Sequence, residues 1–285
     1  MPGRRLLDEG HPRLARYDRR DQVRRRAVLR ETVAALEAAD GRYHALAETN
    51  LARWRAAATS PEPSGEVRVL EDDWGAATHA LTRHHGRCFA VLNMANAHHP
   101  GGAYVEGTAA QEENMFRRTD CHFTIDDDEM DPETERYRPA TTALLRGVAG
   151  AVYLDTARPR VCVRGPEDRA ANDLGYPWLA DDEVFPFFEL RAAAQDCRAK
   201  NFDEDEARRR IAAQLDTLVA AEQRYAVLSA FGCGAFQNPT RKVARLYREE
   251  IDRRRDDFAL IAFAIFHPGY GLDNRPPFAE AFGGG

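Results

Sequence analysis

The sequence predicts an α/β fold in which helices cover both faces of a central sheet. Short apolar runs that suit strands alternate along the chain with segments whose apolar residues recur at helical spacing, a pattern typical of an α/β/α layered domain. The run Phe258–Phe266 (FALIAFAIF) is apolar throughout, as expected for a strand covered on both faces. Another apolar run, Cys88–Leu92, leads directly into a polar loop that contains glycine. Ligands of open α/β sheets bind outside the strand ends, where such loops collect.

Residues 1–65 are predicted to form an N-terminal extension that packs on a catalytic domain of residues 66–285. A basic arm with two prolines comes first, two helical segments follow, and a linker rich in proline and serine ends the extension. In the first helix Leu29 and Val33 belong to an apolar stripe, and the arginines at positions 24–26 are expected on the solvated face. The arm covers residues 1–20, the two helices cover residues 21–40 and 45–58, and the linker covers residues 59–66.

The other elements of the catalytic domain follow from the same patterns. Val184–Leu190 (VFPFFEL) is apolar but contains Pro186, which cannot donate to a sheet ladder, so we expect an edge strand or a bulge there. Asp72 or Asp73 can cap a helix. The other predicted strands are 67–69, 151–154, 160–163 and 225–229. The predicted helices are 72–85, 111–121, 203–224 and 240–253, and residues 125–139 are expected to be a polar surface segment.

Composition and charge exclude several classes of protein. The chain has 285 residues, of which 44% are hydrophobic and 30% charged, as in ordinary soluble globular proteins. Its net charge of −6 argues against broad nucleic-acid binding, and no apolar run approaches the roughly 20 residues that cross a bilayer. The five cysteines include no CxxC pair, and the first residues lack an apolar signal-peptide core. We therefore predict a cytoplasmic protein with free thiols and without membrane or direct nucleic-acid partners.

Two adjacent carboxylates, Glu112 and Glu113, directly follow Gln111 at the start of a predicted helix. Consecutive helical side chains diverge by about 100°, so both can act on one ligand only where the loop enters the helix, with irregular backbone between them. Close carboxylates repel, which raises the pKa of one of them, and such a pair suits cleavage of a glycosidic bond. An acidic first helical turn stabilised by the helix dipole is the alternative explanation.

A second glycine-containing loop, FGCGAFQNP, follows the predicted strand 225–229. Gly232 and Gly234 let the backbone curl, and exposed N–H groups can then form a nest for an anion. Asn238 can cap the next helix with Pro239 at its first position, which would direct the positive helix end to the same place. Phe236 could stack on a base or a sugar, or it could lie in the core of a tight turn. The spacing is not that of a dinucleotide fingerprint.

Both loops carry a resemblance to a known family. Pro100-Gly101-Gly102-Ala103, followed by Gln111-Glu112-Glu113, resembles the signature of microbial-type poly(ADP-ribose) glycohydrolases, a branch of the macrodomain superfamily. The loop LSAFGCGAFQN is similar to the loop with which macrodomains bind the diphosphate of ADP-ribose. The likeness extends from about residue 25 to residue 280 and implies a three-layer α/β/α macrodomain with a central mixed sheet. The family usually has a third glycine where this chain has Ala103.

The resemblance implies a role for each matching residue. Glu113 would be the catalytic acid, Glu112 would hydrogen-bond the terminal ribose, and Gln111 would orient the pair. Asn96 would contact the same ribose, and the backbone of Gly101 and Gly102 would pass close to the ligand. Ala103 adds a methyl group and disfavours positive φ, so it could narrow the cleft or shift the loop. The residues expected at the diphosphate are Gly232, Cys233, Gly234, Ala235, Phe236 and Asn238.

Other polar residues near these motifs are weaker candidates. Asp120 could be a second acid, and His122 is a further polar group beside it. The histidine pairs 84–85 and 98–99 invite a metal interpretation, but neighbouring histidines rarely chelate one ion and no cysteine or carboxylate has ligand spacing. We therefore expect neither a metal nor a cofactor.

The resemblance implies hydrolysis at C1 of the distal ribose of poly(ADP-ribose), with release of ADP-ribose. ADP-ribose or an ADP-ribosylated protein is the expected partner. Two alternatives remain. Ala103 and the extra acidic residues would suit a hydrolase for single ADP-ribose units on protein side chains, arginine among them. A reader that binds ADP-ribose without chemistry would need the glycine loops but not an acid such as Glu113.

Overall fold

A mixed sheet of seven strands forms the centre of the computed structural model, which describes residues 4–267, 269 and 271–283. Its strands are β1 Glu66–Leu70, β2 Ala90–Met94, β5 Tyr153–Leu154, β6 Arg160–Cys162, β7 Phe185–Ala192, β8 Tyr225–Leu228 and β9 Leu260–Ala264. They lie in the order β1-β9-β8-β2-β7-β5, and β6 also pairs with β7. The pairs from β1 to β7 are parallel, whereas β5 and β6 run antiparallel to β7. The predicted α/β fold with a mixed sheet is confirmed.

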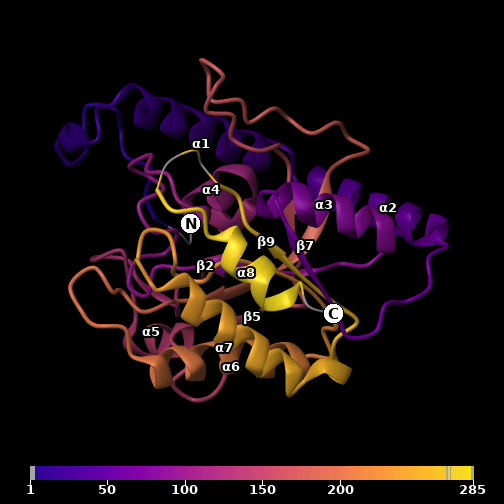
Figure 1. The fold of residues 1–285 in the computed structure, drawn as a ribbon. Coiled ribbons are helices and arrows are strands. Elements are labelled where there is room, and N and C mark those ends of the chain that lie inside the picture. Colours follow the sequence, from indigo (N-terminus) through magenta and orange to yellow (C-terminus); the bar gives the residue numbers. More distant parts are fainter. Residues whose placement is uncertain (1–3, 268, 270, 284–285) are drawn as a thin grey trace.

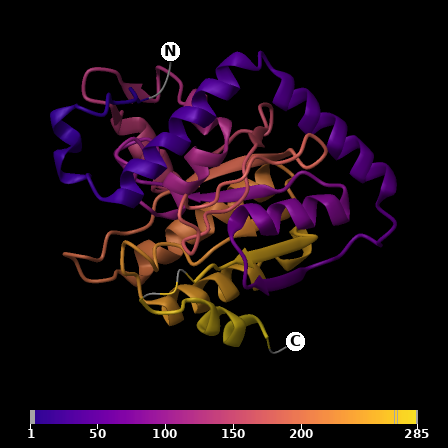
Figure 2. The same cartoon turned by 90° about the horizontal axis from the view of Figure 1, so that it is seen from above.

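Helices cover both faces of this sheet (Figure 1 and Figure 2). One face carries α1 Arg20–Ala38, α2 Arg42–Ala57, α3 Trp74–His85 and α4 Gln111–Arg118. The opposite face carries α6 Glu204–Ala220, α7 Thr240–Asp252 and α8 Arg275–Phe282. The short helix α5 Pro139–Leu145 lies beside the end of β7, and β3 Met130–Asp131 pairs with β4 Arg136–Tyr137 in a separate two-stranded sheet. The polar segment predicted at 125–139 contains this small hairpin.

The two layers meet the sheet through alternating side chains. Val91 of β2 belongs to the core beneath α1 to α4, whereas Ala90 and Leu92 belong to the core beneath α6 to α8. This alternation is the period of two that a strand imposes. Because both faces are covered, β9 is apolar on both of its faces, and every one of its residues is buried.

The N-terminal helices share the core of the catalytic part. Leu29 and Val33 of α1 and Trp54 of α2 lie in the same hydrophobic cluster as the strands. The solvated face expected at the arginines is wrong for two of them, because Arg25 pairs with Glu167 at 2.7 Å and Arg26 pairs with Glu9. Both guanidinium groups are buried. Their partners come from distant segments, so the helical pattern alone could not reveal them.

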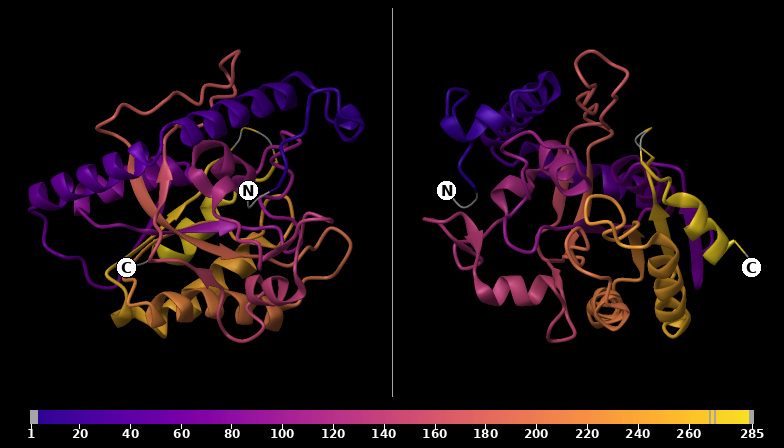
Figure 3. Two further views of the ribbon diagram at one scale, coloured as in Figure 1. Left: turned by 180° about the vertical axis from the view of Figure 1, so that it is seen from behind. Right: turned by 60° about the vertical axis from the view of Figure 1, so that its left-hand side comes forward.

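The N-terminal arm folds back from the start of α1 toward the segment that precedes α4 (Figure 3). It is irregular as predicted, apart from a 3-10 turn at Pro12–Arg16. Leu7 and Leu14 bury their side chains in the core of the α1 to α4 face. The arm is therefore a packed part of the molecule.

The prediction of an edge strand at Pro186 is wrong. β7 pairs with β2 on one side and with β5 and β6 on the other, so it lies inside the sheet. The ladder to β2 begins only at Phe188, and Pro186 lies opposite Val161 of β6. The missing N–H of proline therefore falls outside the β2 ladder, which explains why an inner strand tolerates it.

Helix α8, RPPFAEAF, was not predicted, and it carries two prolines near its start. Proline is tolerated in the first turn of a helix, where its missing N–H has no intrahelical partner. Phe278 anchors α8 in the core beside Tyr247 and Phe263. No helix within the described ranges is long and apolar enough to span a membrane.

Candidate active site

A cavity of about 890 Å³ opens at the carboxyl ends of the parallel strands. Met94 ends β2 and Ala264 ends β9, and both line it together with Ser229, which follows β8. The first turn of α4 forms one wall, and the loop between β8 and α7 forms another. This is where open α/β sheets bind ligands, and the volume is that of a small-molecule site.

Glu112 and Glu113 line this cavity from the first turn of α4. Glu112 Oε2 accepts from the Asn96 N–H at 2.7 Å, and Glu113 Oε1 accepts from the Ala103 N–H at 3.1 Å. Irregular backbone between them was predicted, but the helix already begins at Gln111. The two carboxylates reach one region because Gly102 lies between them. A Cβ at Gly102 would stand 2.5 Å from Glu113 Oε1 and 3.0 Å from Glu112 Oε2.

The electrostatics of the pair favour a bound proton. Burial raises the pKa of Glu112 well above its usual value, and the charge of Glu113 raises it further. The predicted rise of one pKa therefore falls on Glu112. Because an oxygen of each carboxylate lies within 3.0 Å of one point beside Gly102, a proton on Glu112 is held close to Glu113. Glu112 Oε1 is buried without a hydrogen-bond partner among the described residues, although its residue lines the cavity.

Gln111 fixes the start of α4 to the end of β2. Its Oε1 accepts from the Met94 N–H at 2.9 Å, and its Nε2 donates to the Leu92 carbonyl at 2.8 Å. The amide thus pairs with strand β2 as a neighbouring strand would. Asn96 also lines the cavity, and its Oδ1 accepts from the N–H groups of His98 and His99.

The loop that contains Gly101 and Gly102 lies behind the carboxylates, and Gly101, Gly102 and Ala103 do not line the cavity. Gly101 and Gly102 have φ of 68° and 61°, which side chains disfavour. Ala103 is not in this region, so the backbone restriction expected from its methyl group does not arise. A third glycine is unnecessary for this loop conformation.

The loop between β8 and α7 supplies the opposite wall, including Gly232, Gly234 and Ala235. Gly232 has φ of 74°, and a Cβ there would lie 2.5 Å from the Ala194 methyl group. Phe236 is half-buried: it lines the cavity and also packs against the core of the α6 to α8 face. The ring therefore has the predicted contact with the core, and its stacking on a base or a sugar stays a prediction.

The predicted helix cap at Asn238 is wrong. Pro239 is the N-cap of α7, and Asn238 Nδ2 instead donates to the carbonyls of Gln195 at 2.8 Å and Gly232 at 3.1 Å. Asn238 still lines the cavity and ties the loop to the segment after β7. Burial raises the pKa of the Cys233 thiol to about 12, so it stays protonated.

Asp120 is not placed to act as a second acid, because it does not line the cavity. Its Oδ2 lies 2.9 Å from His44 Nε2, and its Oδ1 accepts from the Val161 N–H at 2.8 Å. His122 is buried against Tyr104, and burial lowers its pKa to about 4. Over the described ranges, no three His, Cys, Asp or Glu side chains lie close enough to hold a metal ion.

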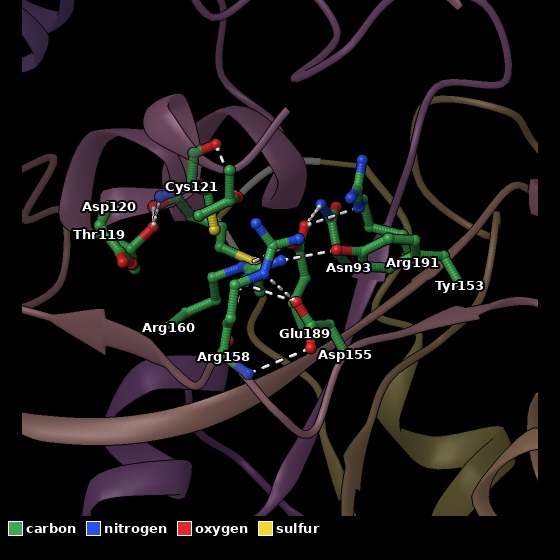
Figure 4. A network of polar contacts seen from close by, with 12 residues as sticks. Asn93, Thr119, Asp120, Cys121, Tyr153, Asp155, Arg158, Arg160, Glu189 and Arg191 are labelled. Atoms are coloured by element: carbon green, nitrogen blue, oxygen red, sulfur yellow. Dashed lines mark hydrogen bonds and ion pairs between the residues drawn. The ribbon is translucent and has the colours of Figure 1, made fainter. Parts of the chain in front are cut away.

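A buried charge network behind the carboxylates was missed by the sequence analysis (Figure 4). Glu189 Oε2 accepts from Arg160 Nε at 3.1 Å, and Glu189 Oε1 accepts from Asn93 Nδ2 at 2.8 Å. Burial opposes the ionisation of Glu189, but the guanidinium groups of Arg191 and Arg160 lower its pKa. Its negative charge adds to the high pKa of Glu112. A charged residue inside the apolar run VFPFFEL was the available signal.

Residues 16–143 match the family described as microbial-type PARG, catalytic domain, where PARG is poly(ADP-ribose) glycohydrolase. The predicted resemblance to this family is confirmed over residues 16–143. The match to microbial-type PARG includes α1 to α4 and both glutamates, whereas the loop after β8 lies beyond it. No curated protein matches the chain.

Solved PARG structures share the fold. PARG from Thermomonospora curvata is 23% identical with a TM-score of 0.63, over 90% of this chain and 99% of that one. PARG from Deinococcus radiodurans in complex with ADP-ribose is 23% identical with a TM-score of 0.56, over 84% of this chain and 90% of that one. At this identity the structures establish the PARG fold for nearly the whole chain.

Proposed function

We propose that this chain hydrolyses poly(ADP-ribose), cleaving the bond at C1 of the distal ribose and releasing ADP-ribose. One observation carries the proposal: two buried carboxylates, Glu112 and Glu113, face a cavity whose opposite wall is the loop between β8 and α7. The match to the PARG catalytic domain includes the carboxylates, and a similar fold has been solved with ADP-ribose.

The proposed substrate places its distal ribose at α4 and its diphosphate at the loop after β8. Gly234 and Ala235 expose the loop backbone, which can offer N–H groups to phosphate oxygens. The N-terminus of α7 adds a positive dipole end near that loop. Phe236 offers a ring face on the same wall, on which a sugar or base can stack.

The proposed chemistry divides between the two carboxylates. Glu113 donates a proton to the leaving oxygen as its bond to C1 breaks, and the positive charge that develops on the ribose is stabilised by the nearby carboxylate. Water then adds to C1 and returns a proton to Glu113. Glu112 accepts a hydrogen bond from a ribose hydroxyl through Oε1, which has no partner of its own among the described residues. Neither step calls for a metal.

The two alternatives are a hydrolase for single ADP-ribose units and a reader that performs no chemistry. A preference for single ADP-ribose units rested on Ala103 and on extra acidic residues such as Asp120. The backbone of Ala103 is unstrained, and neither residue lines the cavity. No observation therefore favours that alternative. A reader has no need of two buried carboxylates, since burying charge is costly without a functional return.

Product analysis tests the proposal. The protein is incubated with poly(ADP-ribose) and, separately, with arginine-linked mono-ADP-ribosylated protein, and the released nucleotides are separated by chromatography. Free ADP-ribose from the polymer is expected. Release only from the mono-modified protein would replace the proposed substrate, and binding without release from either would leave a reader.

A further inference from the structure

The N-terminal arm reaches the back of the candidate active site through Arg4. The Arg4 guanidinium donates to the carbonyl oxygen of Gly102, a residue 98 positions away in the chain. Arg4 is 4% exposed, and its guanidinium lies over the Tyr104 ring at 5.7 Å. A basic residue of an irregular arm is therefore built into the loop that supports the carboxylates.

One peptide group joins Arg4 to Glu113. The carbonyl of Gly102 accepts from Arg4, and the N–H of the same peptide group, which belongs to Ala103, donates to Glu113 Oε1 at 3.1 Å. The two contacts lie at opposite edges of one planar unit. Hydrogen bonds in series polarise one another, so a cation on the carbonyl strengthens the N–H as a donor.

We infer that Arg4 is a positioning residue for the reaction: through the Gly102–Ala103 peptide group it holds Glu113 in its working orientation. This inference rests on the proposed glycohydrolase function. The position of that peptide is critical, because Gly102 lies against both carboxylates and leaves no room for a Cβ. A displacement of the acid by about 1 Å can cost roughly 100-fold in rate.

The arm holds Arg4 in place by contacts of its own. The Arg5 N–H donates to Glu135 Oε1 at 3.0 Å, and Leu7 is buried in the core. Glu106 Oε1 forms salt bridges with two arginines of the arm, with Arg4 Nη2 at 3.2 Å and with Arg13 Nη2 at 2.6 Å. Because Glu106 has both, removal of either arginine leaves it paired.

This shared partner provides a matched control. Arg4→Met and Arg13→Met each remove one guanidinium from Glu106, but only Arg4→Met removes the donor to the Gly102 carbonyl. Wild type and both variants are compared by kcat and KM for release of ADP-ribose from the polymer, by ADP-ribose binding and by thermal unfolding. Arg4→Ala is assayed with added guanidinium chloride, against sodium chloride at equal ionic strength.

The expected result is a fall in kcat of roughly 10-fold to 100-fold for Arg4→Met, with KM and ADP-ribose affinity changed less than about threefold. Arg13→Met is expected to keep kcat within about twofold and, because its guanidinium is more exposed, to lose less stability. Guanidinium is expected to restore part of the kcat of Arg4→Ala, and sodium is not. Equal kcat for Arg4→Met and Arg13→Met would overturn the inference while leaving the function intact. A wild type that releases no ADP-ribose would overturn both.

Discussion

At the scale of single residues, the site depends on what stands between the two carboxylates. Glu112 and Glu113 are consecutive in a helix, and their side chains point in different directions. Gly102 occupies the space between their oxygens and has a left-handed backbone. The pair can therefore serve one ligand although it lies on regular helix.

Gly102→Ala is expected to reduce ADP-ribose release by at least about 100-fold, because its methyl group would displace both carboxylates. The positive φ adds a loss of about 1–2 kcal/mol in the free energy of unfolding. Kinetic assays and thermal melts measure the two effects. The matched control is Ala103→Gly, which restores the third glycine and should change the rate by less than about threefold. Comparable rates for the two variants would contradict this account of the loop.

Glu112→Gln is expected to stabilise the protein at pH 8 and to change little at pH 4. Burial raises the pKa of Glu112, so the folded state keeps its proton while the unfolded chain ionises. Stability from this group is thus fully present below the ordinary glutamate pKa and is lost as pH rises through the higher folded pKa. Glutamine never ionises and escapes that loss. Melting curves recorded between pH 4 and pH 8 test this expected stabilisation, and the exposed Glu48→Gln is the control. Equal curves for wild type and Glu112→Gln would contradict it.

At the scale of elements, local pattern predicted most helices and strands, and tertiary contacts account for the failures. Alternating residues located β1, and short apolar runs located β2, β8 and β9, near their observed bounds. Pro186 suggested an edge, but the ladder to β2 starts two residues later. Asn238 fits a helix cap by sequence. In the folded chain its Nδ2 instead donates to the carbonyls of Gln195 and Gly232. Only the folded chain brings those acceptors near.

The candidate site shows the same division. The sequence motifs predicted that Glu112, Glu113 and Asn96 would lie near the loop after β8. In the structure they line one cavity with that loop. Glu189 was not found, because its hydrogen-bond donors Asn93 and Arg160 come from other segments of the chain. Asp120, close in sequence to the pair, follows the end of α4 and turns toward His44.

Asn238→Ala is expected to loosen the loop after β8. The change removes donors to two backbone carbonyls at a buried position, which typically costs about 1–3 kcal/mol. Because the loop forms one wall of the cavity, ADP-ribose affinity should fall by roughly tenfold. Calorimetry and thermal melts measure both. Asn201→Ala is the control, since Asn201 is exposed and does not line the cavity; an unchanged affinity for Asn238→Ala would show that the loop does not bind the ligand.

At the scale of the whole molecule, the N-terminal extension and the catalytic part share one hydrophobic core. Trp54, Leu29 and Val33 share a core with the strands, and the arm contacts the loop behind the carboxylates. The match to the PARG catalytic domain also begins at residue 16, inside the extension. We propose that the boundary near residue 65 divides the sequence without dividing the folding unit.

A fragment of residues 66–285 is therefore expected not to fold. Its core would lose the side chains that α1 and α2 contribute, and the loss of each large apolar group costs about 2–5 kcal/mol, comparable in sum to the stability of a domain. The full chain should unfold in one transition. A fragment with a sharp melting transition that binds ADP-ribose would contradict a single unit.

The most direct test of the account is Glu113→Gln, with ADP-ribose release from the polymer and ADP-ribose binding measured on the same preparation. Loss of the proton donor should lower kcat by about 100-fold to 10,000-fold, while the affinity for ADP-ribose changes little. That result would identify Glu113 as the acid in an intact site. Full turnover by Glu113→Gln would contradict the proposed mechanism.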